Sequence, residues 1–391
     1  MKTIRVNVEK EYSVNVGRGL LDEIGPLVRA VSGASKAAVV SDATVFALYG
    51  GRIRKGLQDA GFSVSSFAFP AGEQSKNFQT LESILNFLVE SGLQRGDVII
   101  ALGGGVVGDL AGFAASIYMR GINYVQVPTT LLAMVDSSVG GKTAVDLEKG
   151  KNLAGAFWQP LQVICDLDVL ETLPSDIFVE GLGEVIKTNA IAGLGFSEVL
   201  AGGTNLTGTN QTVGASLDAI SNVGADPFDD ALEEIITACI EYKSKIVSED
   251  EFDKKGIRNV LNAGHTVGHC IEKSSGYSVP HGKAVANGLL FEAVMAVKLG
   301  LCKESLMETL KTEVIACGLL MSDANGVGVS ADSPSEDFDP DCWIEIMARD
   351  KKNAGDEISF ILPMDFGNYV EKKIPRPEVR NLLISALEML K

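Results

Sequence analysis

The three histidines of the chain, His265, His269 and His281, all lie within a span of seventeen residues. His265 and His269 are four residues apart, so on a helix their side chains share one face. His281 follows a turn-rich segment, 274–280, that can bring it back toward the other two. Clustered imidazoles suit a first-row metal ion, and a catalytic zinc takes three protein ligands and keeps one position open. The spacing therefore predicts a metal site.

A carboxylate is expected to complete the set of ligands, because Cys270 would point elsewhere on the helix that carries His265 and His269. The best candidate by pattern is Glu184, an ionisable residue in an otherwise apolar helical stretch. Lys187 lies three positions further on, on the same helical face. A solvent-facing ion pair between Glu184 and Lys187 is therefore the alternative interpretation.

A glycine-rich turn in the first half of the chain has the pattern of a pyrophosphate-binding loop. Gly103-Gly-Gly-Val-Val-Gly108 satisfies G-x-G-x-x-G, and it follows an expected strand and opens a helical stretch. The acidic residue usually found about twenty positions later is missing, since 123–130 is neutral, which disfavours an ordinary dinucleotide-dependent dehydrogenase. Asp42, at the end of an earlier expected strand, could bind a ribose hydroxyl instead, although an aspartate there is more often a turn residue.

The elements that must position these residues fall into two parts. Short apolar runs alternate with helical patterns in the first part, which predicts a layered α/β domain. Strands are expected over 37–42, 62–69, 97–102, 124–127 and 163–165, with a helix over 77–91. After about Pro174 the pattern changes to long helical stretches, so we expect domains 1–174 and 175–391, the second closed by a helix over 377–391. Two polar segments, 202–230 and 322–341, are predicted to be surface loops.

The composition limits the classes of function. With 391 residues, 46% of them hydrophobic, the chain is long enough for two globular domains. Its formal net charge of −17 argues against nucleic acid and anionic membranes as partners. The six cysteines form no C-x-x-C pair, and neither an export signal nor a membrane-spanning run is recognised, so a cytoplasmic protein with free thiols is expected. An acidic chain that binds an anionic substrate must gather its positive charge locally.

Longer motifs resemble the 3-dehydroquinate synthase family, within the sugar-phosphate cyclases, over nearly the whole chain. They cover 103–109, 120–143, 150–160, 181–187, 258–269, 281–282 and 350–352. The resemblance implies an N-terminal NAD-binding α/β domain, an all-helical C-terminal metal-binding domain and a homodimer. It also implies the conversion of 3-deoxy-D-arabino-heptulosonate 7-phosphate into 3-dehydroquinate and phosphate, in the shikimate pathway of aromatic amino acid biosynthesis. The steps would be transient oxidation by NAD, elimination of phosphate, return of the hydride and intramolecular aldol closure.

The resemblance also assigns roles to individual residues. It implies that zinc or cobalt is held by Glu184, His265 and His281, and that His269 is catalytic. The NAD site would comprise Asp42, Glu73, Lys76, Gly104, Gly105, Asp109, Thr129, Thr130, Lys151 and Thr172. The substrate would contact Arg120, Asp136, Lys142, Asn152, Lys187, Lys243, Arg258, Asn262 and Lys351. Lys245 remains an alternative to Lys243, and Lys352 an alternative to Lys351.

Three other classes share part of this pattern. A sibling cyclase, such as a 2-deoxy-scyllo-inosose or 2-epi-5-epi-valiolone synthase, shares the metal ligands but lacks the run 136–143 and the carboxylate-binding Arg258. A metal-dependent polyol dehydrogenase of the glycerol dehydrogenase type shares the architecture but needs no dense pocket of Lys and Arg. A catalytically silent NAD-binding scaffold would not need intact metal ligands. The sequence therefore favours the synthase over each of them.

Overall fold

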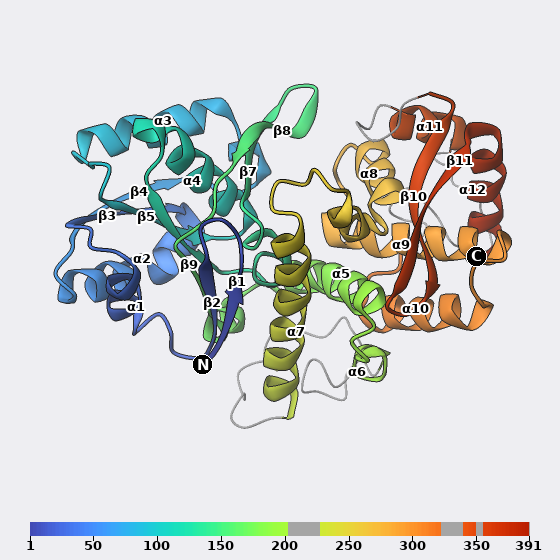
Figure 1. The fold of residues 1–391 in the computed structure, drawn as a ribbon, viewed down its shortest axis with the longest axis horizontal. Helices are drawn as coiled ribbons and strands as arrows, with labels where there is room; N and C mark the ends of the chain where they lie inside the picture. The colour runs from blue at the N-terminus through green and yellow to red at the C-terminus, as the bar shows by residue number, and fades with distance from the viewer. Residues whose placement is uncertain (202–226, 322–338, 349–354, 391) are drawn as a thin grey trace. The chain divides into compact units, whose positions relative to one another are not determined.

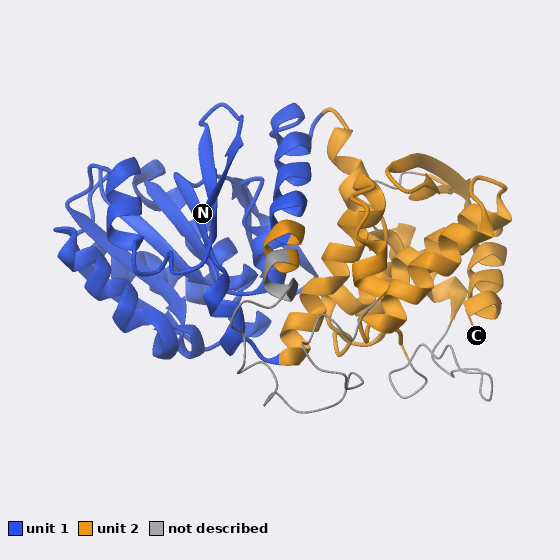
Figure 2. Cartoon of the chain, turned by 90° about the horizontal axis from the view of Figure 1, so that it is seen from below, with its two compact units in different colours: residues 1–174, 236–254 blue, residues 175–235, 255–391 orange. Residues whose placement is uncertain are grey.

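The computed structural model describes four stretches of the chain, residues 1–201, 227–321, 339–348 and 355–390. It divides into two compact units, coloured separately in Figure 2. Unit 1 contains Met1–Pro174 and Ile236–Lys254, and unit 2 contains Ser175–Ile235 and Lys255–Lys391. The segment 236–254, which the sequence division places in the second domain, thus clusters with the first unit.

A seven-stranded sheet forms the centre of unit 1. Its strands are β1 (Lys2–Val6), β2 (Tyr12–Gly17), β3 (Lys36–Asp42), β4 (Ser63–Phe69), β5 (Val98–Gly103), β6 (Asn123–Pro128) and β9 (Gln162–Asp166). Their order is β1-β2-β9-β6-β5-β3-β4, and every neighbouring pair except β1–β2 is parallel. All six residues of β5 are buried, as expected of a parallel strand that is covered on both faces. The predicted α/β domain and its expected strands are confirmed.

Helices cover both faces of this sheet, with α1 (Ile24–Val31) and α2 (Ala43–Asp59) on one face and α3 (Phe78–Glu90) and α4 (Gly105–Ile117) on the other (Figure 1). Helix α3 shows why the chain folds this way, because Leu81, Ile84 and Leu88 recur at helical spacing and are buried. Asn77 begins the helix by accepting the Thr80 N–H at 2.9 Å. The helix expected over 77–91 is confirmed.

The order of the strands places a topological switch point at the carboxyl edge of the sheet. From β3 the chain passes first to β4 on one side, and later to β5 on the other side of β3. Because the crossover helices then lie on opposite faces, the carboxyl ends of β3 and β5 flank an opening, which is where open α/β sheets bind ligands. Asp42 ends β3, and Gly104 and Gly105 follow β5 directly. The sheet therefore brings the glycine turn and Asp42 to its switch point.

Smaller elements complete unit 1. A two-stranded antiparallel hairpin is formed by β7 (Lys142–Leu147) and β8 (Gly150–Phe157). Single helical turns lie at η1 (Glu73–Ser75), η2 (Tyr118–Arg120), η3 (Ala133–Ser137) and η4 (Leu167–Thr172). About half of the expected NAD-site and substrate residues of the first domain fall on these turns and on the hairpin.

Unit 2 is built around α9 (His281–Lys298), whose residues are buried from Ala284 to Ala296. A helix that is buried all round must be covered on every side, and α5, α8, α10, α12 and β10 pack against it. The other helices of unit 2 are α5 (Ser175–Ala192), α6 (Ser197–Ala201), η7 (Ile257–Asn262), α8 (His265–Ser274), α10 (Glu304–Ala316), α11 (Pro340–Ala348) and α12 (Arg376–Leu390). Helix α7 (Pro227–Glu249) begins in unit 2 and belongs to unit 1 from Ile236 onward. The predicted helical domain is confirmed, as is its closing helix, α12.

Unit 2 also contains one antiparallel hairpin that the sequence analysis did not predict, β10 (Glu357–Asp365) with β11 (Asn368–Pro375). Most of the two predicted surface loops, 202–230 and 322–341, falls outside the described residues, and so do Lys351 and Lys352.

Among the described residues, no helix combines the length and the apolar character that crossing a membrane requires.

Candidate active site

Three side chains in unit 2 converge as metal ligands would. Glu184 lies in α5, His265 is the first residue of α8 and His281 is the first residue of α9. The Glu184 Oε1 atom is 3.3 Å from His281 Nε2 and 3.6 Å from His265 Nε2. Ligand atoms at the corners of a tetrahedron with zinc bonds of about 2.0–2.1 Å lie roughly 3.4 Å apart. The spacing of these donor atoms therefore fits a zinc-sized ion.

Glycines beside each of these residues allow the three helices to meet at backbone contact. A Cβ atom on Gly282 would lie 1.7 Å from the Glu180 carbonyl oxygen, and one on Gly183 would lie 2.1 Å from the Gly282 oxygen. On Gly264, which has a φ of +77°, a Cβ would lie 2.6 Å from the Val285 oxygen. Gly183, Gly264 and Gly282 directly adjoin the three candidate ligands. The close approach that positions the site is thus available only to glycine.

The Glu184 carboxylate carries its charge in the interior of unit 2. Glu184 and Lys187 are each only 1% exposed and form an ion pair, so the alternative of a solvent-facing pair is wrong. Burial opposes ionisation of Glu184, but Lys187, followed by His281 and His265, outweighs it and holds the pKa of the carboxyl well below its ordinary value. The carboxylate is therefore ionised, as a metal ligand must be.

The ring nitrogens of the two histidines among the candidate ligands have distinct partners. His265 Nδ1 lies 3.1 Å from the Ala263 carbonyl oxygen, which can only accept, so Nδ1 carries the proton and Nε2 presents its lone pair. His281 Nδ1 lies 3.4 Å from Glu272 Oε1. Burial lowers the pKa of His265 to about 3. It also opposes the charge on His281, but Glu184 and Glu272 raise that pKa to about 10, so a metal ion would displace a proton from this ring.

His269 is not part of the converging group. It lies one turn after His265 in α8, with ring centroids 5.5 Å apart and ring planes at 90°. Cys270 is buried, and its Sγ faces the Trp343 carbonyl oxygen at 3.5 Å, away from Glu184 as its helical position predicts. The shared helical face of His265 and His269 thus supplies one candidate ligand and one nearby imidazole.

In unit 1, charged and polar groups gather near the carboxyl ends of β3 to β6. Lys76 is 5% exposed and forms an ion pair with Asp109 on α4 at 2.5 Å. The Thr129 Oγ1 atom, after β6, is buried without a hydrogen-bond partner in the described part of the chain. Gly104 caps α4 without any side-chain bond to the helix N-terminus. A buried hydroxyl without a partner and a helix N-terminus without a side-chain cap are groups that a phosphate-bearing cofactor can satisfy.

Other expected NAD-site residues already have partners within the protein. Asp42 accepts the Val45 N–H at 2.9 Å and so caps α2. Thr130 Oγ1 accepts the Ala133 N–H at 3.1 Å, and the Thr172 hydroxyl lies 2.5 Å from the Tyr49 hydroxyl. Each of these contacts fixes a side chain at the end of a strand or turn. At Gly105, the first residue of α4, the Ser137 side chain leaves space for only a small side chain.

Glu73 belongs to the same charged group as Lys76. Burial raises the pKa of Glu73, Lys76 and Lys151 oppose the shift, and Asp146 adds to it. Lys151 on β8 therefore acts on this carboxylate.

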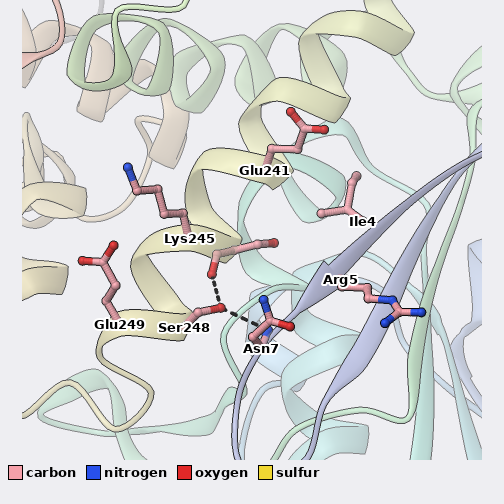
Figure 3. A pocket seen from close by; sticks show the side chains of 8 residues that line it. Ile4, Arg5, Asn7, Glu241, Lys245, Ser248 and Glu249 are labelled. Atoms are coloured by element: carbon pink, nitrogen blue, oxygen red, sulfur yellow. Dashed lines mark hydrogen bonds between the residues drawn. The ribbon is translucent and has the colours of Figure 1, made fainter.

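The structure places the side chains of Lys243 and Lys245 in different surroundings. Lys243 is 8% exposed, and its Nζ donates to the Asp136 backbone oxygen at 2.6 Å and pairs with the Asp136 carboxylate at 2.8 Å. Lys245 instead lines a different pocket of about 350 Å³ between β1 and α7 (Figure 3). That pocket is lined by Ile4, Arg5, Asn7, Glu241, Ser244, Lys245, Ser248 and Glu249. Only Lys243 lies beside another expected substrate residue.

The remaining substrate candidates of unit 1 lie on turns and on the β7–β8 hairpin. Lys142 pairs with Asp253 at 2.7 Å. Asn152 and Arg120 both have left-handed backbone conformations, with φ of +56° and +67°. The Asn152 N–H donates to the Asp146 carboxylate at 2.8 Å, which holds the turn. The sequence analysis did not predict Asp253, because in the sequence it is only one acidic residue shortly before Arg258.

Two substrate candidates of unit 2, Arg258 and Asn262, lie shortly before the histidines in sequence. Arg258, on η7, is 4% exposed, and Asn262 ends the same turn. The Asn262 amide donates to the Asn259 carbonyl oxygen at 3.1 Å. A buried arginine five residues before Ala263 places a permanent positive charge shortly before the start of α8.

Solved structures share this architecture of a sheet unit and a helical unit. A 2-epi-5-epi-valiolone synthase from Streptomyces hygroscopicus subsp. jinggangensis matches with a TM-score of 0.81 and 22% identity, over 97% of each chain. A 2-deoxy-scyllo-inosose synthase matches with a TM-score of 0.78 and 24% identity, over 98% of this chain and 99% of that one. The chain therefore shares the fold of these two synthases.

The sequence identifies the family within that class. Residues 66–180 match the family described as 3-dehydroquinate synthase N-terminal, and residues 181–353 match 3-dehydroquinate synthase C-terminal. The 3-dehydroquinate synthase of Caulobacter vibrioides is 42% identical over 98% of both chains. The chain belongs to the 3-dehydroquinate synthase family.

We expect that Gly282→Ala disrupts the site, because its Cβ would overlap the Glu180 backbone. The change should lower the free energy of unfolding by about 2–4 kcal/mol and abolish the stabilisation that added zinc gives. Gly51→Ala is the matched control, since its Cβ meets nothing within 4 Å on the exposed side of α2. It should be neutral or stabilising by about 0.5–1 kcal/mol. Urea unfolding with and without zinc measures both, and wild-type behaviour of Gly282→Ala would contradict this account of the packing.

Proposed function

We propose that the protein is a 3-dehydroquinate synthase that uses NAD and a divalent metal ion, zinc or cobalt. The observation that carries the proposal is the convergence of Glu184, His265 and His281 in a chain of this family. The reaction is the conversion of 3-deoxy-D-arabino-heptulosonate 7-phosphate into 3-dehydroquinate and phosphate, a carbon–oxygen lyase reaction in the shikimate pathway. It serves aromatic amino acid biosynthesis.

The metal ion would be held by Glu184 and by the Nε2 atoms of His265 and His281. Two imidazoles with one carboxylate are a donor set of the catalytic zinc type, which leaves a position open for substrate. When bound, the metal supplies Lewis acidity at the substrate hydroxyl that is to be oxidised. The 2-epi-5-epi-valiolone synthase of similar fold has NAD⁺ and Zn²⁺ bound.

The NAD site is proposed for the switch point of the sheet in unit 1. Gly104 and Gly105 would admit the pyrophosphate to the N-terminus of α4, and the buried Thr129 hydroxyl would gain a partner. Asp42 would bind a ribose hydroxyl with an oxygen not used in capping. The other proposed contacts are Glu73, Lys76, Asp109, Thr130, Lys151 and Thr172. When bound, NAD accepts a hydride and returns it, so it is not consumed.

Binding of the substrate carboxylate and phosphate is assigned to the positively charged residues. Guanidinium groups suit bidentate contact with both anions, and ammonium groups act as point charges. The positively charged candidates are Arg120, Lys142 and Lys243 in unit 1 and Lys187 and Arg258 in unit 2, with Lys351 as a further candidate. Asp136, Asn152 and Asn262 are proposed as further substrate contacts. In a chain of net charge −17, these lysines and arginines supply the positive charge that an anionic substrate needs.

His269 and Asn262 are proposed to manage the proton at the substrate C5 oxygen. This role is supported by the position of His269 on α8, where its ring lies beside that of His265 and outside the group of candidate ligands. Asn262 adds an amide that can hold the oxygen in place.

We also propose that the protein is a homodimer in the cytoplasm, with neither nucleic acid nor membrane as a partner.

The test of the proposed function is release of phosphate from the heptulosonate phosphate. We expect release that requires NAD in catalytic amounts, stops on chelation and returns with added zinc, without net accumulation of NADH. NADH that accumulates in proportion to turnover would indicate a polyol dehydrogenase instead. No release from fully metal-loaded protein would favour a sibling cyclase.

A matched pair of lysine variants tests the substrate site of unit 1. Lys243→Met should lower kcat/KM by about 100-fold or more, because it removes a charge-assisted contact of about 3 kcal/mol. Lys245→Met should leave it within about twofold, since its side chain lines the separate pocket beside β1. The phosphate-release assay measures both, and a larger loss in Lys245→Met would overturn the assignment.

A further inference from the structure

Glu272 is a buried carboxylate that neither the proposed ligand set nor the proposed substrate contacts include. It is 6% exposed and lies on α8, seven residues after His265. His269 and Glu272 follow His265 by four and seven residues, so the three side chains lie on one face of the helix. Glu272 therefore faces the metal site from the same helix as His265.

The turn after α8 brings His281 back onto this carboxylate. After the helix, Gly276 and Tyr277 have left-handed conformations, and the Tyr277 N–H donates to the Glu272 backbone oxygen at 2.7 Å. The chain then enters α9 at His281, whose Nδ1 lies 3.4 Å from Glu272 Oε1. The opposite ring nitrogen, Nε2, lies 3.3 Å from Glu184 Oε1. One imidazole thus bridges two buried carboxylates, one on each side.

We propose that Glu272 is a positioning residue of the metal site, which holds the His281 ring through Nδ1 and directs Nε2 toward Glu184 and His265. The proposal rests on the metal site of the proposed function. A carboxylate on the far nitrogen of a histidine ligand fixes the ring orientation and the tautomer and makes the metal-binding nitrogen more basic. His265 has a backbone oxygen in the same place, from Ala263. The two histidine rings are therefore oriented by different groups. Only the group that orients His281 is a side chain, so only this one can be changed by substitution.

The experiment measures zinc affinity by competition with a chromogenic chelator, in the full-length protein. Glu272→Gln keeps the size of the side chain and removes its charge, and it should weaken zinc binding ~10- to 100-fold. Glu272→Asp keeps the charge but shortens the reach, and it should give an intermediate loss. The visible spectrum of the Co²⁺-loaded protein should also change in Glu272→Gln, because the imidazole is no longer held at the same angle.

Glu313→Gln is the matched control for loss of a buried carboxyl group in the same unit. Glu313 lies on α10, and burial raises its pKa to about 7 although Ser197 and Asn189 partly oppose the shift. The glutamine resembles the protonated carboxyl, so zinc affinity should stay within about twofold of wild type. An equal loss in Glu313→Gln would mean that any buried carboxyl of unit 2 matters, which would overturn the specific role of Glu272.

The outcomes separate this inference from the proposed function. If wild-type protein binds no zinc, the proposed metal site itself is wrong. If wild type binds zinc and Glu272→Gln binds it equally well with the same Co²⁺ spectrum, the positioning role is wrong. Should Glu272→Gln fail to fold, Glu272→Asp decides, because wild-type zinc affinity in that variant would also overturn the proposal.

Discussion

The site in unit 2 depends on placing one ionised carboxylate, Glu184, almost entirely out of water. A buried charge without partners costs several kcal/mol, so the surrounding groups must compensate it. Lys187 supplies a permanent positive charge, and the two histidines supply polar nitrogens on the other side. The three helices can approach closely enough for this only because glycines adjoin all three ligands. The electrostatics of the site therefore depend on the close packing of α5, α8 and α9.

The NAD site that we propose in unit 1 has a different requirement, because backbone groups rather than a cluster of charged side chains would bind the phosphates. The switch point between β3 and β5 presents a glycine turn and a helix N-terminus without a side-chain cap. The Lys76–Asp109 pair is nearly buried beside it, so its lysine is held in place rather than free to swing. In a strongly acidic chain, such fixed positive groups would favour the anionic substrate and cofactor that we propose.

The sequence predicted the parts of this account that follow from local spacing. The histidine cluster, the glycine turn and the strands of unit 1 have periodic or adjacent patterns, and the structure confirms those strands. The roles of Glu272 and Asp253 could not be predicted, because each is defined by contact with a residue brought near by a turn or by tertiary packing. Hairpin β10–β11 was missed because its second strand, 368–375, is polar at most positions and lacks clear alternation. Glu184 was identified but left open between ligand and surface ion pair, since burial is a tertiary property.

The central claim is that Glu184, His265 and His281 bind the metal and that His269 does not. X-ray absorption spectroscopy of the zinc-loaded protein tests it directly, because scattering from imidazole rings can be counted. The account predicts two imidazoles, with the remaining ligands being oxygen at about 2.0–2.2 Å. A third imidazole would make His269 a ligand, and a sulfur ligand at about 2.3 Å would implicate a cysteine. Either result would contradict the ligand set argued from the structure.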